Sequence, residues 1–187
     1  MPKFSARPKS LKVSDFNYYL ADEVQLELYK KINVSGSLED QVDAFYIALF
    51  PDIFKKKQGF SITAQLRVTS SGQRTDLSVR VLNNHDFKRV IICESKRREF
   101  ESHSSVWADA LQQAVDYAVS NREEAGRLRK SMYLTVNIGT YIRFYELRHN
   151  AYQAIDWAPA GTECYELADD EADVWRLFHE LRDTVLS

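Results

Sequence analysis

The chain has 187 residues, of which 44% are hydrophobic and 12% aromatic, so it is long enough to bury one sizeable core. Its 25 basic and 27 acidic residues leave a formal charge of −2, which excludes a global excess of positive charge as the means of attracting nucleic acid or an anionic membrane. Any such partner has to be bound by local clusters of basic residues. The two cysteines, Cys93 and Cys164, lack CxxC spacing, which argues against a zinc site or a disulfide framework and favours a reducing, intracellular location.

The N-terminal segment differs in composition from the rest of the chain. Residues 1–13 carry four basic residues and two prolines before the first acid, which predicts a flexible basic arm. This segment lacks the apolar core of a secretory signal, and no stretch of the chain approaches the roughly 18 apolar residues of a membrane span. We therefore expect residues 14–187 to form a single domain that makes no contact with a membrane.

Two helices are predicted before the first strand. Apolar residues recur at helical intervals over residues 15–31, with Ser14 or Asp15 available as the N-cap. After the turn "NVSGS", residues 37–50 have a strongly apolar face and begin with a Ser-x-x-Asp approximation of a capping box. Because proline disrupts a helix interior, we expect the second helix to end at Pro51.

From residue 59 the apolar period changes to two, which is typical of strands. The segments "GFSITAQLRVTSS", "TDLSVRVLN" and "KRVIICESK" are separated by the turn sequences "SSGQR" and "NNHD", so three consecutive strands are predicted to form an antiparallel meander. Residues 104–120 predict a long helix, residues 131–139 and 140–149 two further strands, and residues 170–186 a closing amphipathic helix. The order α α β β β α β β α predicts an α/β sandwich.

Three charged side chains are predicted to converge at one end of the sheet. Glu94 and Lys96 are two apart on the third strand and so share a face, and antiparallel pairing across "NNHD" brings Asp76 of the second strand towards Glu94. Two neighbouring carboxylates favour binding of Mg²⁺ or Mn²⁺. A lysine beside them can stabilise the transition state of phosphodiester hydrolysis or orient the attacking water.

The helix at residues 104–120 adds two polar side chains outside its main apolar stripe. Gln113 and Tyr117 are one turn apart, on a flank of the helix that we expect to face the edge of the sheet. A glutamine and a tyrosine placed in this way can hydrogen-bond a catalytic carboxylate or a substrate phosphate.

Asp76, the "ESK" of residues 94–96 and the "QAVDY" of residues 113–117 resemble the PD-(D/E)xK nuclease superfamily, in the QxxxY branch that contains RecB-type and type I restriction motor-subunit nucleases. The resemblance covers residues 37–148. It implies a restriction-endonuclease-like sandwich with a central mixed sheet, the core order α-β-β-β-α-β, and extra N- and C-terminal helices. It also implies a Mg²⁺-dependent nuclease acting on DNA, with Asp76 and Glu94 as metal ligands.

The same resemblance implies that Glu39 is the acid that the family carries on its first core helix, although Asp40 and Asp43 are equally available on that helix. Gln113 and Tyr117 would complete the catalytic set. Thr75 stands where the family has a proline before the strand acid, and no glycine follows Asp76.

Basic residues near the "ESK" segment are candidates for phosphate contacts. Arg97 and Arg98 directly follow it, and Lys88 precedes it on the same strand. Acidic residues between 163 and 173 could dock a protein partner. Two alternatives stay open: a catalytically degenerate member of the same fold that binds nucleic acid or protein within a larger complex, and an unrelated α/β interaction domain in which the "ESK" segment is coincidental.

Overall fold

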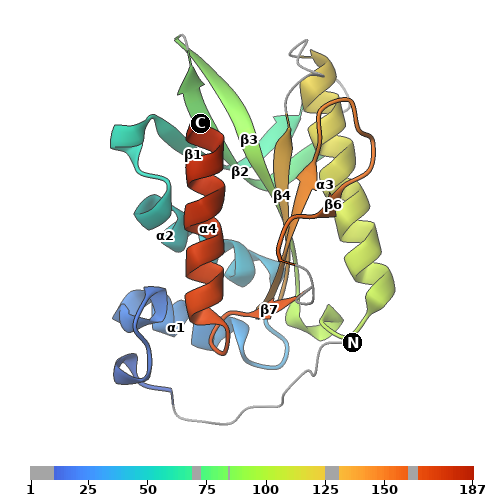
Figure 1. Cartoon of the computed structure of the whole chain (residues 1–187). Helices are drawn as coiled ribbons and strands as arrows, with labels where there is room; N and C mark the ends of the chain where they lie inside the picture. The colour runs from blue at the N-terminus through green and yellow to red at the C-terminus, as the bar shows by residue number, and fades with distance from the viewer. Residues whose placement is uncertain (1–10, 69–72, 84, 125–130, 160–163) are drawn as a thin grey trace.

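The computed structural model describes residues 11–68, 73–83, 85–124, 131–159 and 164–187. The described helices and strands follow the predicted order, with two short strands added near the C-terminus (Figure 1). In chain order they are α1 (Glu23–Ile32), α2 (Glu39–Ile53), β1 (Phe60–Val68), β2 (Gln73–Asn83), β3 (Asp86–Lys96), α3 (Ser104–Glu124), β4 (Met132–Ile138), β5 (Tyr141–Leu147), β6 (Ile155–Asp156), β7 (Tyr165–Glu166) and α4 (Glu171–Leu186).

The strands form one open mixed sheet in the order β1-β2-β3-β4-β5-β6, with β7 paired to β5 as well. β1, β2 and β3 are an antiparallel meander, as predicted. β3 and β4 are parallel and are connected through α3, whereas β4 and β5 form an antiparallel hairpin that turns at Gly139. The prediction of an α/β chain with a mixed sheet is therefore confirmed.

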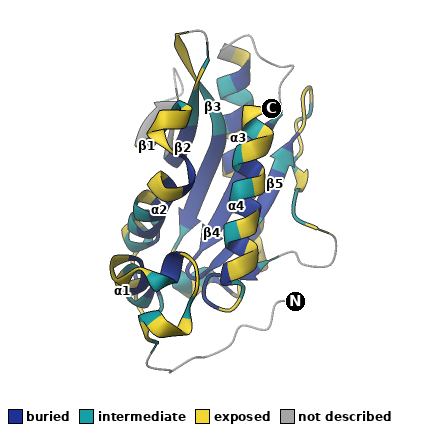
Figure 2. Ribbon diagram, turned by 60° about the vertical axis from the view of Figure 1, so that its left-hand side comes forward, coloured by how far each residue is buried: buried dark blue, intermediate teal, exposed yellow. Residues whose placement is uncertain are grey.

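Helices cover both faces of the sheet. A large buried cluster lies between the sheet and helices α1, α2 and α4, and a smaller one lies between the sheet and α3. The strands are mostly buried while the outer faces of the helices are exposed (Figure 2). Successive side chains of β3 point to opposite faces of the sheet: Ile91 and Cys93 belong to the large cluster and Ile92 to the small one.

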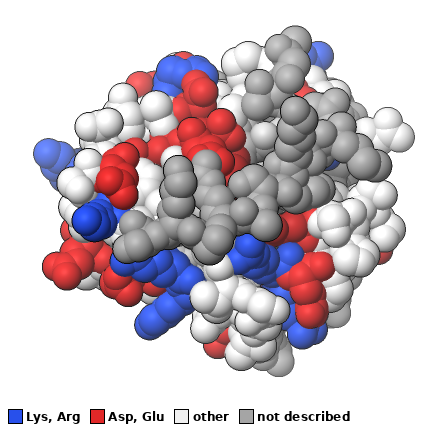
Figure 3. Space-filling model, turned by 90° about the horizontal axis from the view of Figure 1, so that it is seen from below, with Lys and Arg blue, Asp and Glu red and all other residues white. Residues whose placement is uncertain are grey.

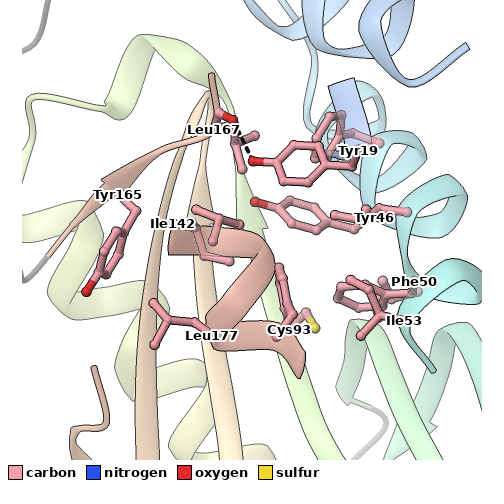
Figure 4. Packing of buried hydrophobic residues seen from close by; sticks show 14 of the residues in the cluster. Tyr19, Tyr46, Phe50, Ile53, Cys93, Ile142, Tyr165, Leu167 and Leu177 are labelled. Atoms are coloured by element: carbon pink, nitrogen blue, oxygen red, sulfur yellow. Dashed lines mark hydrogen bonds between the residues drawn. The ribbon is translucent and has the colours of Figure 1, made fainter. Parts of the chain in front are cut away.

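The large cluster is rich in aromatic rings. Tyr46 and Phe50 of α2 face Cys93 of β3 across the core, and the hydroxyl of Tyr19 donates a hydrogen bond to the carbonyl of Leu167 (Figure 4). Phe50 and Phe178 of α2 and α4 meet edge to face with ring centroids 5.4 Å apart. These contacts hold α2 firmly against β3, which is the strand that carries the "ESK" segment.

The first helix begins later than predicted. Residues 13–15 and 19–21 form 3-10 turns, and α1 starts at Glu23 with Asp22 as its N-cap, whose carboxylate accepts the N–H of Gln25. Neither Ser14 nor Asp15 caps this helix. The reason is a long-range contact: Glu171 of α4 accepts backbone N–H groups of Asn17, Tyr18 and Leu20, which holds them out of α-helical geometry.

The second helix also departs from its predicted ends. α2 begins at Glu39 rather than at residue 37, with Leu38 as its N-cap, and the Gln41 side chain accepts the N–H of Leu38 at 3.0 Å. Pro51 does not end the helix but lies inside its last turn. A proline removes only its own N–H donor, and the next turn still closes through the bond from the Phe54 N–H to the Phe50 carbonyl.

The predicted N-terminal arm, residues 1–13, falls mostly outside the described residues; of its described part, Leu11 and Val13 pack against the large cluster. Among the helices that the structure describes, none is both long and apolar enough to cross a membrane.

Candidate functional site

Asp76 and Glu94 lie where two neighbouring strands separate. The β2–β3 ladder ends at the pair Leu77–Cys93. Beyond that pair β2 continues alongside β1, and β3 continues alongside β4 as far as Lys96. If the register is extended by one position beyond Leu77–Cys93, Asp76 falls opposite Glu94 on one face, at the inner corner of this fork.

Asp76 is attached to the end of β3 by a hydrogen bond. Its Oδ2 accepts the backbone N–H of Ser95 at 2.9 Å. A side-chain oxygen thus replaces the strand partner that Ser95 loses where the ladder ends. The bond brings the carboxylate of Asp76 beside the Glu94–Lys96 segment and leaves its second oxygen available for a ligand.

Glu94 is buried, with 3% of its surface exposed, and carries one engaged and one unengaged oxygen. Its Oε1 accepts a hydrogen bond from Lys96 Nζ at 2.6 Å. Its Oε2 is buried and has no hydrogen-bond partner among the described residues. A buried carboxylate oxygen without a partner is costly, so a cation at this position would stabilise it.

Lys96 also joins the sheet to α2. Its Nζ lies 3.9 Å from Oε2 of Glu39, at the first residue of that helix. Burial alone would lower the pKa of Lys96, but Glu94, Glu39 and Asp76 outweigh it and raise that pKa, so the side chain is an ammonium ion. Of the three acids available on α2, Glu39 is therefore the one that contacts the lysine.

Glu94 and Glu39 are harder to ionise than they would be in water. Burial, followed by the charge of Asp76, raises the pKa of Glu94 to about 7. Burial likewise raises the pKa of Glu39, with a further contribution from Asp76. Mutual repulsion between Asp76, Glu94 and Glu39 is the electrostatic condition that favours a bound cation.

The arrangement fits a magnesium ion held by few protein ligands. Within the described ranges no group of three or more His, Cys, Asp or Glu side chains is close enough to hold a metal. Mg²⁺ keeps several waters and commonly binds one or two carboxylates together with substrate phosphates. Asp76 and the free Oε2 of Glu94 suit that mode of binding, and waters or phosphate oxygens would complete the coordination.

Of the two helix residues predicted for the site, Tyr117 interacts electrostatically with its carboxylates. Tyr117 is partly buried against the small cluster, and burial followed by the charges of Glu94 and Asp76 raises its pKa. Gln113, one turn earlier on α3, is exposed. The phenol of Tyr117 is thus within electrostatic reach of the carboxylates.

The predicted phosphate-binding residues are divided between the two ends of β3. Arg97 directly follows Lys96; it is exposed and pairs with Glu99 at 3.2 Å. Arg98 is less exposed and lies 3.8 Å from Glu101. Lys88 stands six residues before Glu94, which is about 20 Å along an extended strand, so it does not share the site.

The end of the molecule seen in Figure 3 carries acidic and basic side chains side by side rather than one sign of charge. A nucleic acid approaching the described part of this end would therefore meet cationic and acidic side chains together.

One acid that the sequence left as an alternative to Glu39 also lies near the site. Asp43 lies one turn after Glu39 on α2; burial first, and then the charges of Asp76 and Glu39, raise its pKa to about 6. Its Oδ1 is buried and has no hydrogen-bond partner among the described residues. Asp40, by contrast, is exposed. Spacing in the sequence does not separate these acids, because Asp43 is a helix neighbour of Glu39 at i, i+4 and of Asp40 at i, i+3.

Comparison of the chain with protein-family models, with curated proteins and with solved structures finds no significant match.

Proposed function

We propose that the chain is a divalent-metal-dependent nuclease of the PD-(D/E)xK type that hydrolyses phosphodiester bonds of DNA. Its described elements include the succession α2-β1-β2-β3-α3-β4, which has the expected core order. The observation that carries the proposal is the fork between β2 and β3. There Asp76 accepts the N–H of Ser95, the neighbour of Glu94, and Lys96 donates to Glu94.

Each side chain has a distinct task in the proposed reaction. Asp76 and Glu94 would hold Mg²⁺ or Mn²⁺ between them. The bound ion would supply a Lewis acid for the phosphate and lower the pKa of a coordinated water. Lys96, which remains an ammonium ion, would orient the attacking water and stabilise the negative charge that develops on the phosphate oxygens.

The surrounding residues would tune these groups. Glu39 helps to hold the Lys96 ammonium at the end of β3. Tyr117 can donate a hydrogen bond to a carboxylate or a phosphate, and Arg97 is exposed beside the site as a contact for the nucleic-acid backbone.

Cleavage assays with plasmid, linear duplex, single-stranded DNA and RNA test the proposal, with Mg²⁺ or Mn²⁺ and with EDTA. We expect metal-dependent cleavage that Lys96→Ala and Asp76→Asn each lower by roughly 10²-fold or more. Asp76→Asn keeps an oxygen for the Ser95 N–H, so its loss of activity reports the charge rather than unfolding.

Lys31→Ala and Asp52→Ala, at exposed positions on α1 and α2, are matched controls and should cleave like the wild type. Folding of every variant is checked by its thermal unfolding. Metal-dependent cleavage that survives in both site variants would contradict the proposed site.

A second candidate is a non-cutting domain of the same type that binds nucleic acid. The observation that favours it is the hydrogen bond from Lys96 to Glu94. It already engages one oxygen of Glu94, which is the buried member of the two proposed metal ligands. Binding of DNA that is unchanged by EDTA, with no cleavage of any substrate, would select this alternative.

A further inference from the structure

A cavity of about 340 Å³ lies at the opposite end of the sheet from the candidate site. Its walls come from β2, β3 and β4 and from the C-terminal ends of α3 and α4, all at the end of the molecule where the C-terminus lies (Figure 1). Lys88, which the sequence linked to the Glu94 site, is one of its lining residues. The volume lies within the range of small-molecule binding pockets.

The innermost cation of this cavity is Arg122 of α3, which is only 3% exposed. Nη1 donates to the carbonyl of Arg148 at 2.9 Å and Nη2 to that of Leu147 at 3.1 Å, so the guanidinium is held in one orientation. Among the described residues, its Nε has no hydrogen-bond partner and no carboxylate forms an ion pair with Arg122.

A buried guanidinium without a counter-ion is unfavourable. Arginine stays protonated in proteins, and two neutral carbonyls satisfy donors without neutralising the charge. Burial lowers the pKa of Arg122, as expected for a guanidinium that pairs with none of the described acids. An anion bound in the cavity would supply the missing negative charge.

The other lining residues strengthen the positive character of the cavity. Lys88 and Arg89 of β3 and His149 after β5 line it together with Arg122, and none of its described lining residues is Asp or Glu. The carboxylate of Glu146 contacts one lining residue, since it accepts a hydrogen bond from Ser131 at 2.8 Å; it also pairs with Arg148 at 3.4 Å.

We propose that this cavity binds a phosphate monoester of about mononucleotide size. Three permanent cations favour a phosphate dianion over a singly charged carboxylate. The apolar part of the wall, which includes Val90, Tyr133 and Val185, would contact the organic portion of the ligand. The asparagine amides of residues 83 and 121 can hydrogen-bond the polar edges of a base or a sugar.

Isothermal titration calorimetry in EDTA tests the proposal with four probes: deoxyadenosine 5′-monophosphate, ribose 5-phosphate, inorganic phosphate and deoxyadenosine. We expect the two phosphate monoesters to bind and deoxyadenosine not to bind. Tighter binding of the nucleotide than of the sugar phosphate would identify a nucleotide pocket, and equal binding a sugar-phosphate pocket. Both results support the proposal.

Two variants locate the binding. Lys88→Ala should weaken binding of the nucleotide about tenfold or more, because it removes a charge-assisted contact. Arg122→Ala should abolish binding in a protein whose folding is verified by circular dichroism. Lys31→Ala is the control, because Lys31 lies on α1, which does not line the cavity, and this variant should bind as the wild type does.

Ligand binding in this cavity does not depend on the nuclease proposal. Asp76→Asn should leave nucleotide binding in EDTA unchanged, because Asp76 and Lys88 lie towards opposite ends of the β2–β3 ladder. Binding of deoxyadenosine as tight as that of its monophosphate, no binding of any phosphate probe, or an unchanged affinity in Lys88→Ala would each overturn the assignment.

Discussion

Lys96 donates a hydrogen bond to Glu94 two positions earlier on β3, and its Nζ also lies 3.9 Å from Glu39 of α2. The ammonium thus connects the strand to the first residue of a helix that packs against the sheet. The position of Lys96 depends on both carboxylates. This relationship makes Glu39 a positioning residue for the lysine.

Glu39→Gln should therefore lower cleavage activity by roughly tenfold, since the amide retains the shape but loses the charge that attracts Lys96. Asp40→Asn is the matched control, one residue later on the same helix and exposed, and should leave the rate unchanged. Rates measured at saturating metal test this prediction, and equal effects of the two substitutions would contradict it.

Binding of Mg²⁺ should weaken in acid. Burial and the charge of Asp76 raise the pKa of Glu94 from 4.5 to about 7, so below that pH a metal ion has to displace a proton. We expect the apparent Mg²⁺ affinity to fall about tenfold per pH unit below 7 and to level off above it.

The metal-free protein should show the opposite trend. A raised pKa in the folded state means that protonation of Glu94 stabilises the fold, and that this contribution is lost as the pH rises from 4.5 through about 7. Melting temperatures measured across this range with and without Mg²⁺ check both trends. A Mg²⁺-induced rise in melting temperature that does not change with pH would argue against Glu94 as a ligand.

Tyr117→Phe should lower the cleavage rate by several-fold while leaving the fold intact. The phenol is close enough to Glu94 and Asp76 for their charges to raise its pKa, and the substitution removes only its hydroxyl. Gln112→Ala, at an exposed position of α3 where the side chain bonds Asp116, is the control. Comparable losses in the two variants would mean that the effect comes from α3 as a whole.

Gly139→Ala should destabilise the protein by about 3 kcal/mol or more, combining a left-handed backbone with a steric clash. Gly139 has φ 57°, and a Cβ there would lie 2.7 Å from the Cα of Arg98. Its N–H also bonds the carbonyl of Lys96, so cleavage activity should fall too.

Gly36→Ala is the matched control for this prediction. Gly36 has φ 79°, but no atom of the described residues lies within 4 Å of the position that a Cβ would take, so only the backbone cost of about 1 kcal/mol applies. Urea unfolding of the two variants measures the difference. Equal destabilisation would show that the contact between the β4–β5 turn and Arg98 is unimportant.

Glu171→Ala should lower the free energy of unfolding by about 2–4 kcal/mol, because backbone donors of Asn17, Tyr18 and Leu20 lose their acceptor. Asp173→Ala, two residues later and exposed, should have no measurable effect. Hydrogen exchange would localise the change to residues 17–20. Unchanged protection of these amides in Glu171→Ala would refute the proposed anchor.

Local pattern determined most of the secondary structure. The period of two in residues 59–96 predicted three strands, and the helical period in residues 104–120 predicted α3, because alternate burial on a strand and a stripe on a helix are visible without knowing the partner. The ends of α1 and α2 were predicted wrongly. A distant contact, that of Glu171 with Leu20, decides where α1 begins, and no local propensity reports such a contact.

The alternation of β3 likewise predicted from sequence that Glu94 and Lys96 share a face. The tertiary structure decided the rest of the site: the fork that ends the β2–β3 ladder at Leu77–Cys93, and the contact of Glu39 with Lys96. Alternation specifies which face a side chain occupies. The register and extent of pairing depend on packing between strands and helices far apart in the chain, and only the folded chain reveals them.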